Sequence, residues 1–179
     1  MKAIAFISLA ILALSGCDEY SGLYIDESCS AREVALIETA VERFNAVVPV
    51  DYEVLLMGRV SATNDDRTGE GPESRDVIMC FDVDTSEPEL QNYNGDSDRK
   101  YTGKIDYDDI LLRRRLDENE DRWLHTVMHE LDHYGAGAWH VTDPDSVMYK
   151  HNNPVTNYTK YDVAEFSLRL GRKEKNSDY

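Results

Sequence analysis

The chain has 179 residues and a formal net charge of −16 at pH 7, from 35 acidic and 19 basic side chains. This length suits one domain with a single hydrophobic core, and no internal repeat or low-complexity segment indicates a second. The acidic excess makes nucleic acids and anionic lipid surfaces poor partners, because both repel a negatively charged protein.

The N-terminus has the pattern of an export signal. Lys2 supplies a positive charge, residues 3–14 form an apolar run too short to span a membrane comfortably, and small residues then lead to Cys17. The stretch Leu-Ser-Gly-Cys at 14–17 resembles the lipobox of bacterial lipoproteins, in which the cysteine receives a diacylglyceryl group. An ordinary signal peptide cut nearby, with Cys17 incidental, is the alternative.

The lipoprotein resemblance divides the chain into a signal peptide at 1–16, a lipidated tether at 17–29 and one domain at 30–179. It implies an exported protein that its N-terminal lipid anchors to a membrane, on the periplasmic face or the cell surface of a bacterium. Removal of the signal peptide takes away one charged residue, Lys2. The mature chain then carries 18 basic against 35 acidic side chains, a net charge of −17.

If Cys17 is acylated, Cys29 and Cys80 are the remaining thiols. An oxidising compartment favours a disulfide between them, which would tie the segment before the first predicted helix to a predicted strand. Two buried free thiols are the alternative, because the sequence does not show that the two side chains meet.

The first predicted element is an amphipathic helix at 31–47, capped by Ser30 and ended by Pro49. Its apolar stripe consists of Val34, Ile37, Val41 and Phe44. Residues 50–60 and 76–83 predict strands from their β-branched and aromatic content, and the intervening 61–74, rich in Asn, Asp, Gly and Pro, predicts a loop.

Oxygen-bearing side chains are concentrated after the second predicted strand. They are Asp82, Asp84, Asn92, Asn94, Asp96, Asp98, Asp106, Asp108 and Asp109. Alternating donors around a glycine, as in residues 92–98, suit a structural calcium ion. Acidic loops without metal are also common, so both interpretations stay open at this point.

Residues 111–134 predict a long helix, interrupted near Leu116 by the acidic stretch 117–121, and residues 163–170 predict the last helix. Together the elements indicate an α+β domain in which a twisted mixed sheet packs on helices.

The long predicted helix carries His-Glu-Leu-Asp-His at 129–133. Residues four apart lie on one helix face, so His129 and His133 can bind one metal ion while Glu130 stays free to act as a base. His140, after a glycine turn, would complete three protein ligands and leave the fourth position open, as catalytic zinc requires. Two surface histidines on an amphipathic helix are the non-functional alternative.

These residues, with Asp143, Pro144 and Met148 after them, resemble the metzincin metallopeptidases and most closely the matrixin branch. The tail from His140 onward is similar to the matrixin order of third zinc histidine, Asp-Pro and Met-turn. The likeness continues more weakly over about 30–171, in the segments 75–81, 103–108 and 158–171.

The resemblance implies a zinc-dependent endopeptidase with a metzincin-like fold, including an active-site helix, a Met-turn and a C-terminal helix. One zinc ion would be held by His129, His133 and His140, and Glu130 would be the general base for a zinc-activated water. Met148 would form an apolar floor under the metal. The partners implied are a protein or peptide substrate, with the chain a monomer. The alternative is a metal-binding or partner-binding scaffold without turnover.

One departure from the family pattern concerns the third histidine. The family places two residues between the second histidine and the glycine, whereas this chain has three, 134–136, so His140 arrives one position late. An extra helical residue rotates the subsequent chain by about 100° and advances it by about 1.5 Å. We expect a bulge or an early helix end at Gly135 to absorb this, with Asp143 as the alternative third ligand.

Overall fold

The structure is a computed structural model that describes residues 22–49, 52–63, 75–82, 103–106, 109–113, 119–149 and 154–176. Cys17, the signal segment and the candidate calcium loop at 92–98 lie outside the described residues. In the described part, no helix is both long and apolar enough to cross a membrane.

Within the described residues, five strands form one sheet in the order β2-β1-β3-β5-β4. Their bounds are Gly22–Asp26 for β1, Leu55–Val60 for β2, Asp76–Phe81 for β3, Gly103–Asp106 for β4 and Asp109–Arg113 for β5. The four strands β2, β1, β3 and β5 are parallel, and β4 pairs antiparallel with β5 at the edge. The expected mixed sheet is therefore present, with β3 at its centre.

The first strand corrects the boundary of the domain. We predicted residues 17–29 to be a tether, but β1 lies inside the sheet between β2 and β3, with Leu23 fully buried and Ile25 almost so. The alternation of apolar and other residues in Gly-Leu-Tyr-Ile-Asp is the ordinary signal of a strand.

A second correction concerns residues 111–113, which we predicted to begin the long helix. They belong to β5, in which all five residues are buried. Strands of a parallel sheet that are covered on both faces consist of continuous apolar runs, and periodicity does not separate such a run from a buried helix. The helix itself, α3, spans Glu120–Ala136.

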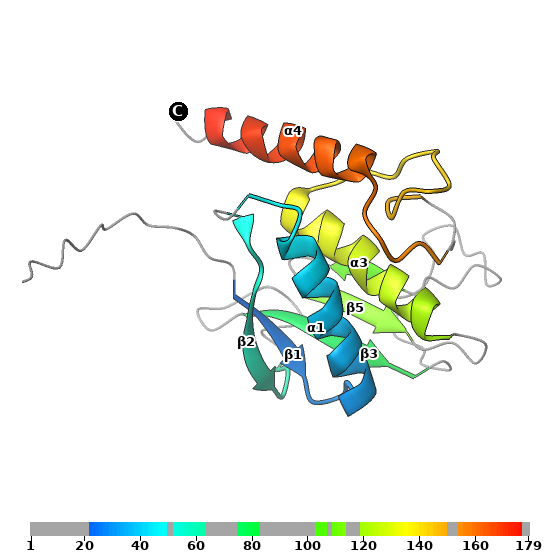
Figure 1. Cartoon of the computed structure of the whole chain (residues 1–179). Helices are drawn as coiled ribbons and strands as arrows, with labels where there is room; N and C mark the ends of the chain where they lie inside the picture. Colours follow the sequence, from blue (N-terminus) through cyan, green and yellow to red (C-terminus); the bar gives the residue numbers. More distant parts are fainter. Residues whose placement is uncertain are drawn as a thin grey trace, which may run out of the picture.

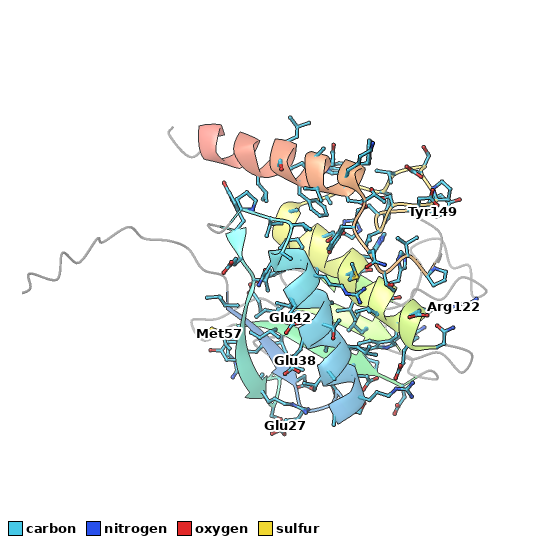
Figure 2. The ribbon with its side chains drawn as sticks, in the orientation of Figure 1. Glu27, Glu38, Glu42, Met57, Arg122 and Tyr149 are labelled. Carbon is cyan, nitrogen blue, oxygen red and sulfur yellow. A yellow bond between two sulfur atoms is a disulfide. The ribbon has the colours of Figure 1, made fainter. Side chains whose placement is uncertain are left out.

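Helix α1 spans Ala31–Asn45 and begins as the sequence predicts. The Ser30 side chain accepts a hydrogen bond from the Glu33 backbone N–H, and the Glu33 carboxylate accepts one from the Ser30 backbone, which together form a capping box. Ile37 and Phe44 point into the core, while Glu38 and Glu42 lie on the exposed outer side of the helix (Figure 2).

Figure 1 shows α1 and α3 side by side on one face of the sheet, with α4, Lys160–Asn176, beyond them at one end of the molecule. The last helix is thus longer than the predicted 163–170. A disulfide joins Cys29, just after β1, to Cys80 in β3, and both residues are buried. This is the pairing that export would favour, and the free-thiol alternative is not what the structure contains.

Candidate metal centre

Helix α3 positions the first two histidines. Asn119 caps its N-terminus by accepting a hydrogen bond from the Arg122 backbone N–H at 3.0 Å. Its apolar face, which includes Val127, Met128 and Leu131, is fully buried against the core. Because this face fixes the rotation of the helix, His129 and His133 project together, one turn apart, from an adjoining partly buried face.

Three imidazole rings converge beside this face. The Nε2 atom of His140 lies 3.0 Å from that of His129 and 3.2 Å from that of His133. Three ligand atoms, one from each ring, lie within 4.8 Å of one another. Ligands at about 2.0–2.1 Å from a tetrahedral zinc ion are about 3.3–3.4 Å apart, so the spacing of these nitrogens is close to that of a zinc site.

The opposite nitrogens of two rings identify their tautomers. His129 Nδ1 lies 2.8 Å from the Val147 carbonyl oxygen, and His133 Nδ1 lies 2.7 Å from that of Ala138. A carbonyl can only accept, so each Nδ1 carries the proton and each Nε2 keeps its lone pair. Backbone carbonyls commonly orient metal-binding histidines in this way. The two lone pairs face the third histidine, an arrangement that a cation would satisfy.

The extra residue before His140 is accommodated differently from our prediction. Helix α3 continues through Gly135 to Ala136, without a bulge, and ends at Gly137 in the left-handed conformation, φ 59° and ψ 33°. The Ala138 N–H then donates to the Asp132 carbonyl at 3.0 Å. This reversal returns the chain to the metal-binding face, so the later register of His140 does not separate it from the other two histidines.

Gly135 has another structural role. A Cβ atom built there would lie 2.9 Å from Cε1 of Phe44 and closer still to Cζ. Glycine therefore permits the close crossing of α1 and α3, and its backbone conformation is an ordinary helical one. Asp143, the alternative ligand, is exposed, lies outside the histidine cluster and accepts a hydrogen bond from the Asp145 backbone N–H.

Glu130 follows His129 in α3 and is buried, with 7% of its surface exposed. Burial raises the pKa of its carboxyl from 4.5 to about 8. Burial also lowers the pKa of His129 from 6.5 to about 3, a shift that the bond to Val147 partly opposes. At neutral pH the metal-free site therefore combines the neutral imidazole of His129 with a carboxyl group, on Glu130, that is close to its point of titration.

The segment after His140 folds back beneath the site. The Val141 N–H donates to the Met148 carbonyl at 2.9 Å, and the 146–148 stretch is buried. Ser146 Oγ accepts from the Met148 N–H and donates to the Asp162 carboxylate at the start of α4. These bonds hold the turn that presents the Val147 carbonyl to His129.

Two polar pairs that the sequence analysis did not assign also support the site. Asp132, fully buried on α3, accepts from the Tyr158 hydroxyl at 2.6 Å, and its Oδ2 atom has no hydrogen-bond partner among the described residues. Burial raises the pKa of Asp132 well above its usual value. The second pair is Thr159 and Asp162, which cap α4 reciprocally. The Thr-x-x-Asp spacing is a helix-start signal that could have located this end.

His125, one turn before His129, is buried and directs Nδ1 at the Val155 carbonyl, 2.8 Å away. Its ring lies 5.9 Å from that of His129, centroid to centroid. It does not belong to the three-histidine cluster, which is the one metal-competent group in the described part of the chain. Its hydrogen bond to Val155 instead connects the segment before α4 to helix α3.

No protein-family model and no curated protein sequence matches the chain. Among solved structures the fold is similar to archaemetzincin from Methanopyrus kandleri, with a TM-score of 0.57 and 16% sequence identity. The match covers 89% of this chain and the whole of that one. At this identity the likeness concerns the fold alone.

Proposed function

We propose that this domain is a zinc-dependent peptidase that cleaves within polypeptide chains. The observation that carries the proposal is the convergence of three imidazole nitrogens within 4.8 Å. Beside one of these histidines in the chain is a buried glutamate, Glu130, that does not belong to the cluster. A structural zinc site uses four protein ligands, whereas three leave a position for the reacting molecules. The similarity of the fold to a protein named archaemetzincin supports the same interpretation.

The donor set suits zinc. Three neutral imidazoles are typical zinc ligands, and the carbonyls of Val147 and Ala138 hold two of them in the tautomer that binds a metal through Nε2. A zinc ion bound by His129, His133 and His140 supplies Lewis acidity, which lowers the pKa of water and polarises a carbonyl group.

Glu130 is the proton carrier in this proposal. It takes a proton from the attacking water and later gives that proton to the amine that leaves the cleaved peptide bond. A general base works best when its pKa lies near the operating pH. Burial raises the pKa of Glu130 to about 8 in the metal-free protein, and the positive charge of a bound zinc ion would lower that pKa again, toward the operating pH. Its position on α3, one residue from a ligand, fixes it to the same rigid helix.

The buried turn under the site has a supporting function. Met148, 3% exposed, packs in the hydrophobic core. In this proposal it forms the apolar floor under the metal, as the methionine of a Met-turn would. Through Ser146, the Asp162 carboxylate steadies the turn and hence the carbonyl that orients His129. These contacts support a site held on a rigid base, which a catalytic zinc needs in order to keep its geometry.

Strand β4 suits the binding of an extended substrate. It is the antiparallel edge of the sheet and contacts α3, the helix that carries the ligands. An extended peptide can add to such an edge through backbone hydrogen bonds, which recognise a chain on both sides of a bond rather than at its end. An internal peptide bond is therefore the proposed target.

The proposal also includes export and anchoring through a lipid on Cys17, with the substrates among exported proteins. The disulfide between Cys29 and Cys80 supports it, because such bonds persist in oxidising compartments outside the cytosol. The lipobox-like sequence at 14–17 is the basis for the anchor itself.

The test compares Glu130→Gln with the wild-type protein, zinc-loaded, on an unbiased peptide library. We expect zinc content to be unchanged and hydrolysis to fall by roughly 10²-fold or more, since a general base contributes 10²–10⁴-fold. Glu38→Gln, at an exposed site on α1, is the matched control and should cleave at the wild-type rate. Equal hydrolysis by Glu130→Gln and the wild type would exclude Glu130 as the proton carrier. No cleavage by the zinc-loaded wild type would favour the scaffold without turnover.

A further inference from the structure

Trp139 is the most exposed of the large apolar side chains in the described part of the chain, at 72%. Tryptophan is usually among the more buried residues, because it carries the largest apolar surface of any side chain. The other tryptophan, Trp123, follows this rule at 6%. Trp139 is also covalently next to His140, so this exposed residue belongs to the short segment that leads from the end of α3 to the third histidine.

The backbone on either side explains why this indole faces solvent. Before it, the buried Ala138 donates its N–H to the Asp132 carbonyl, and its own carbonyl accepts from His133. After it, the ring of His140 is directed at the other two histidines. The contacts that fix the ligands therefore also fix the backbone at residue 139.

This arrangement leaves a rigid aromatic surface beside the site. A side chain with two rotatable bonds loses little entropy when a partner covers it, which is why tryptophan often contributes most at binding surfaces. A peptide bound at the metal continues past His140 at about 3.4 Å per residue, so residues within about two positions of the cleaved bond pass close to Trp139. The partner that buries the most water-exposed area against an indole is a large apolar side chain.

We infer that Trp139 is a specificity-determining residue that contacts a large apolar or aromatic side chain of the peptide substrate, close to the cleaved bond. The inference rests on the proposed peptidase function and adds the substrate class to it. The favoured substrates are extended segments rich in leucine or phenylalanine, which folded proteins keep inside and unfolded chains expose.

The test measures binding without turnover, in zinc-loaded Glu130→Gln protein. Its probes are blocked pentapeptides of alanine with phenylalanine, leucine, lysine or alanine at one position. Acrylamide quenching of indole fluorescence reports mainly on the exposed Trp139, because Trp123 is buried. A Trp139→Phe variant measures the remaining signal of Trp123, which is the baseline. We expect the phenylalanine and leucine peptides to protect Trp139 from the quencher, and the all-alanine peptide to do so at least about tenfold more weakly.

Substitutions complete the design, with binding followed by calorimetry. Trp139→Ala should weaken the binding of the apolar peptides about tenfold, close to 1.4 kcal/mol, and Trp139→Phe should restore most of it. Met57→Ala, at an exposed apolar site on the distant edge strand β2, is the control and should change nothing. In enzyme with Glu130 intact, Trp139→Ala should raise KM for these peptides and leave kcat and zinc affinity unchanged.

Three binding results would overturn the inference. They are equal binding by Trp139→Ala and wild type, a preference for the lysine peptide, and protection of Trp139 by phosphatidylethanolamine–phosphatidylglycerol vesicles in place of peptides, which would make this a membrane contact. Cleavage that is independent of Trp139 would overturn the inference and keep the peptidase. Selective binding of apolar peptides without any cleavage would keep Trp139 as the contact for apolar side chains and overturn the peptidase function.

Discussion

Gly135 lies where helix α3 crosses α1, and replacing it with alanine distinguishes two reasons for its presence. A Cβ there would lie within 2.9 Å of the Phe44 ring, a distance that real Cβ contacts essentially never show. The backbone of Gly135 is helical and its φ is not positive. The structure therefore assigns the glycine to close packing, whereas the motif spacing alone had suggested a special backbone conformation.

The expected magnitude comes from two opposing terms. Forcing a methyl group into a well-packed core costs about 1–3 kcal/mol, while alanine gains about 1 kcal/mol over glycine inside a helix. Gly135→Ala should thus lower the free energy of unfolding by up to about 2 kcal/mol. In a Phe44→Leu background the ring is gone, and the same change should raise it by about 0.5–1 kcal/mol.

Urea denaturation of the wild type, both single variants and the double variant measures this coupling, which we expect to be about 1–3 kcal/mol. Gly171→Ala is the control: a Cβ at this exposed glycine in α4 would meet no atom within 4 Å, so alanine should stabilise by about 0.5–1 kcal/mol. If Gly135→Ala destabilises both backgrounds equally, the packing explanation fails and a backbone requirement replaces it.

Three further results are expected. Ser146→Ala removes the link between Asp162 and the turn that orients His129, so zinc affinity measured by chelator competition should fall by roughly 10–100-fold; unchanged affinity would argue against the supporting role. In the metal-free protein, folding raises the pKa of Glu130 from 4.5 to about 8, so the free energy of unfolding should fall as pH rises through that range. Urea unfolding at pH 5 and pH 8 should show that Glu130→Gln lacks this fall. Cys17→Ser should move the protein from the membrane fraction to the soluble one, and unchanged fractionation would exclude the lipid anchor.

The parts of the fold that the sequence predicted are those with strong local signals. Helix α1 begins at the predicted cap because Ser30 and Glu33, three positions apart, form a reciprocal pair of hydrogen bonds that needs no distant partner. The pairing of His129 with His133 likewise needs nothing beyond the period of a helix. Such features are readable because the interactions that determine them lie within one or two turns.

The strands β1 and β5 were missed for a different reason. Each is short and acquires its identity from neighbours far along the chain: β1 pairs with β2 and β3, and β5 with β3 and β4. In β5 the run Ile-Leu-Leu is equally suited to a buried helix, and only its position in the sheet decides. The buried bond between Asp132 and Tyr158 joins residues 26 positions apart, and spacing alone could not have identified it.

The orientation of the ligands depends on groups that every residue possesses. His129 and His133 are oriented by the carbonyls of Val147 and Ala138, and a backbone carbonyl leaves no trace in the sequence. The orientation of these histidines therefore depends on the path of the chain after α3, and not on the number of residues before His140. When the helix lengthens by one residue, its left-handed cap at Gly137 moves with it, and the carbonyl of the next residue still meets His133. A site of this kind tolerates a one-residue insertion at the end of its helix, provided that a glycine follows directly to reverse the chain.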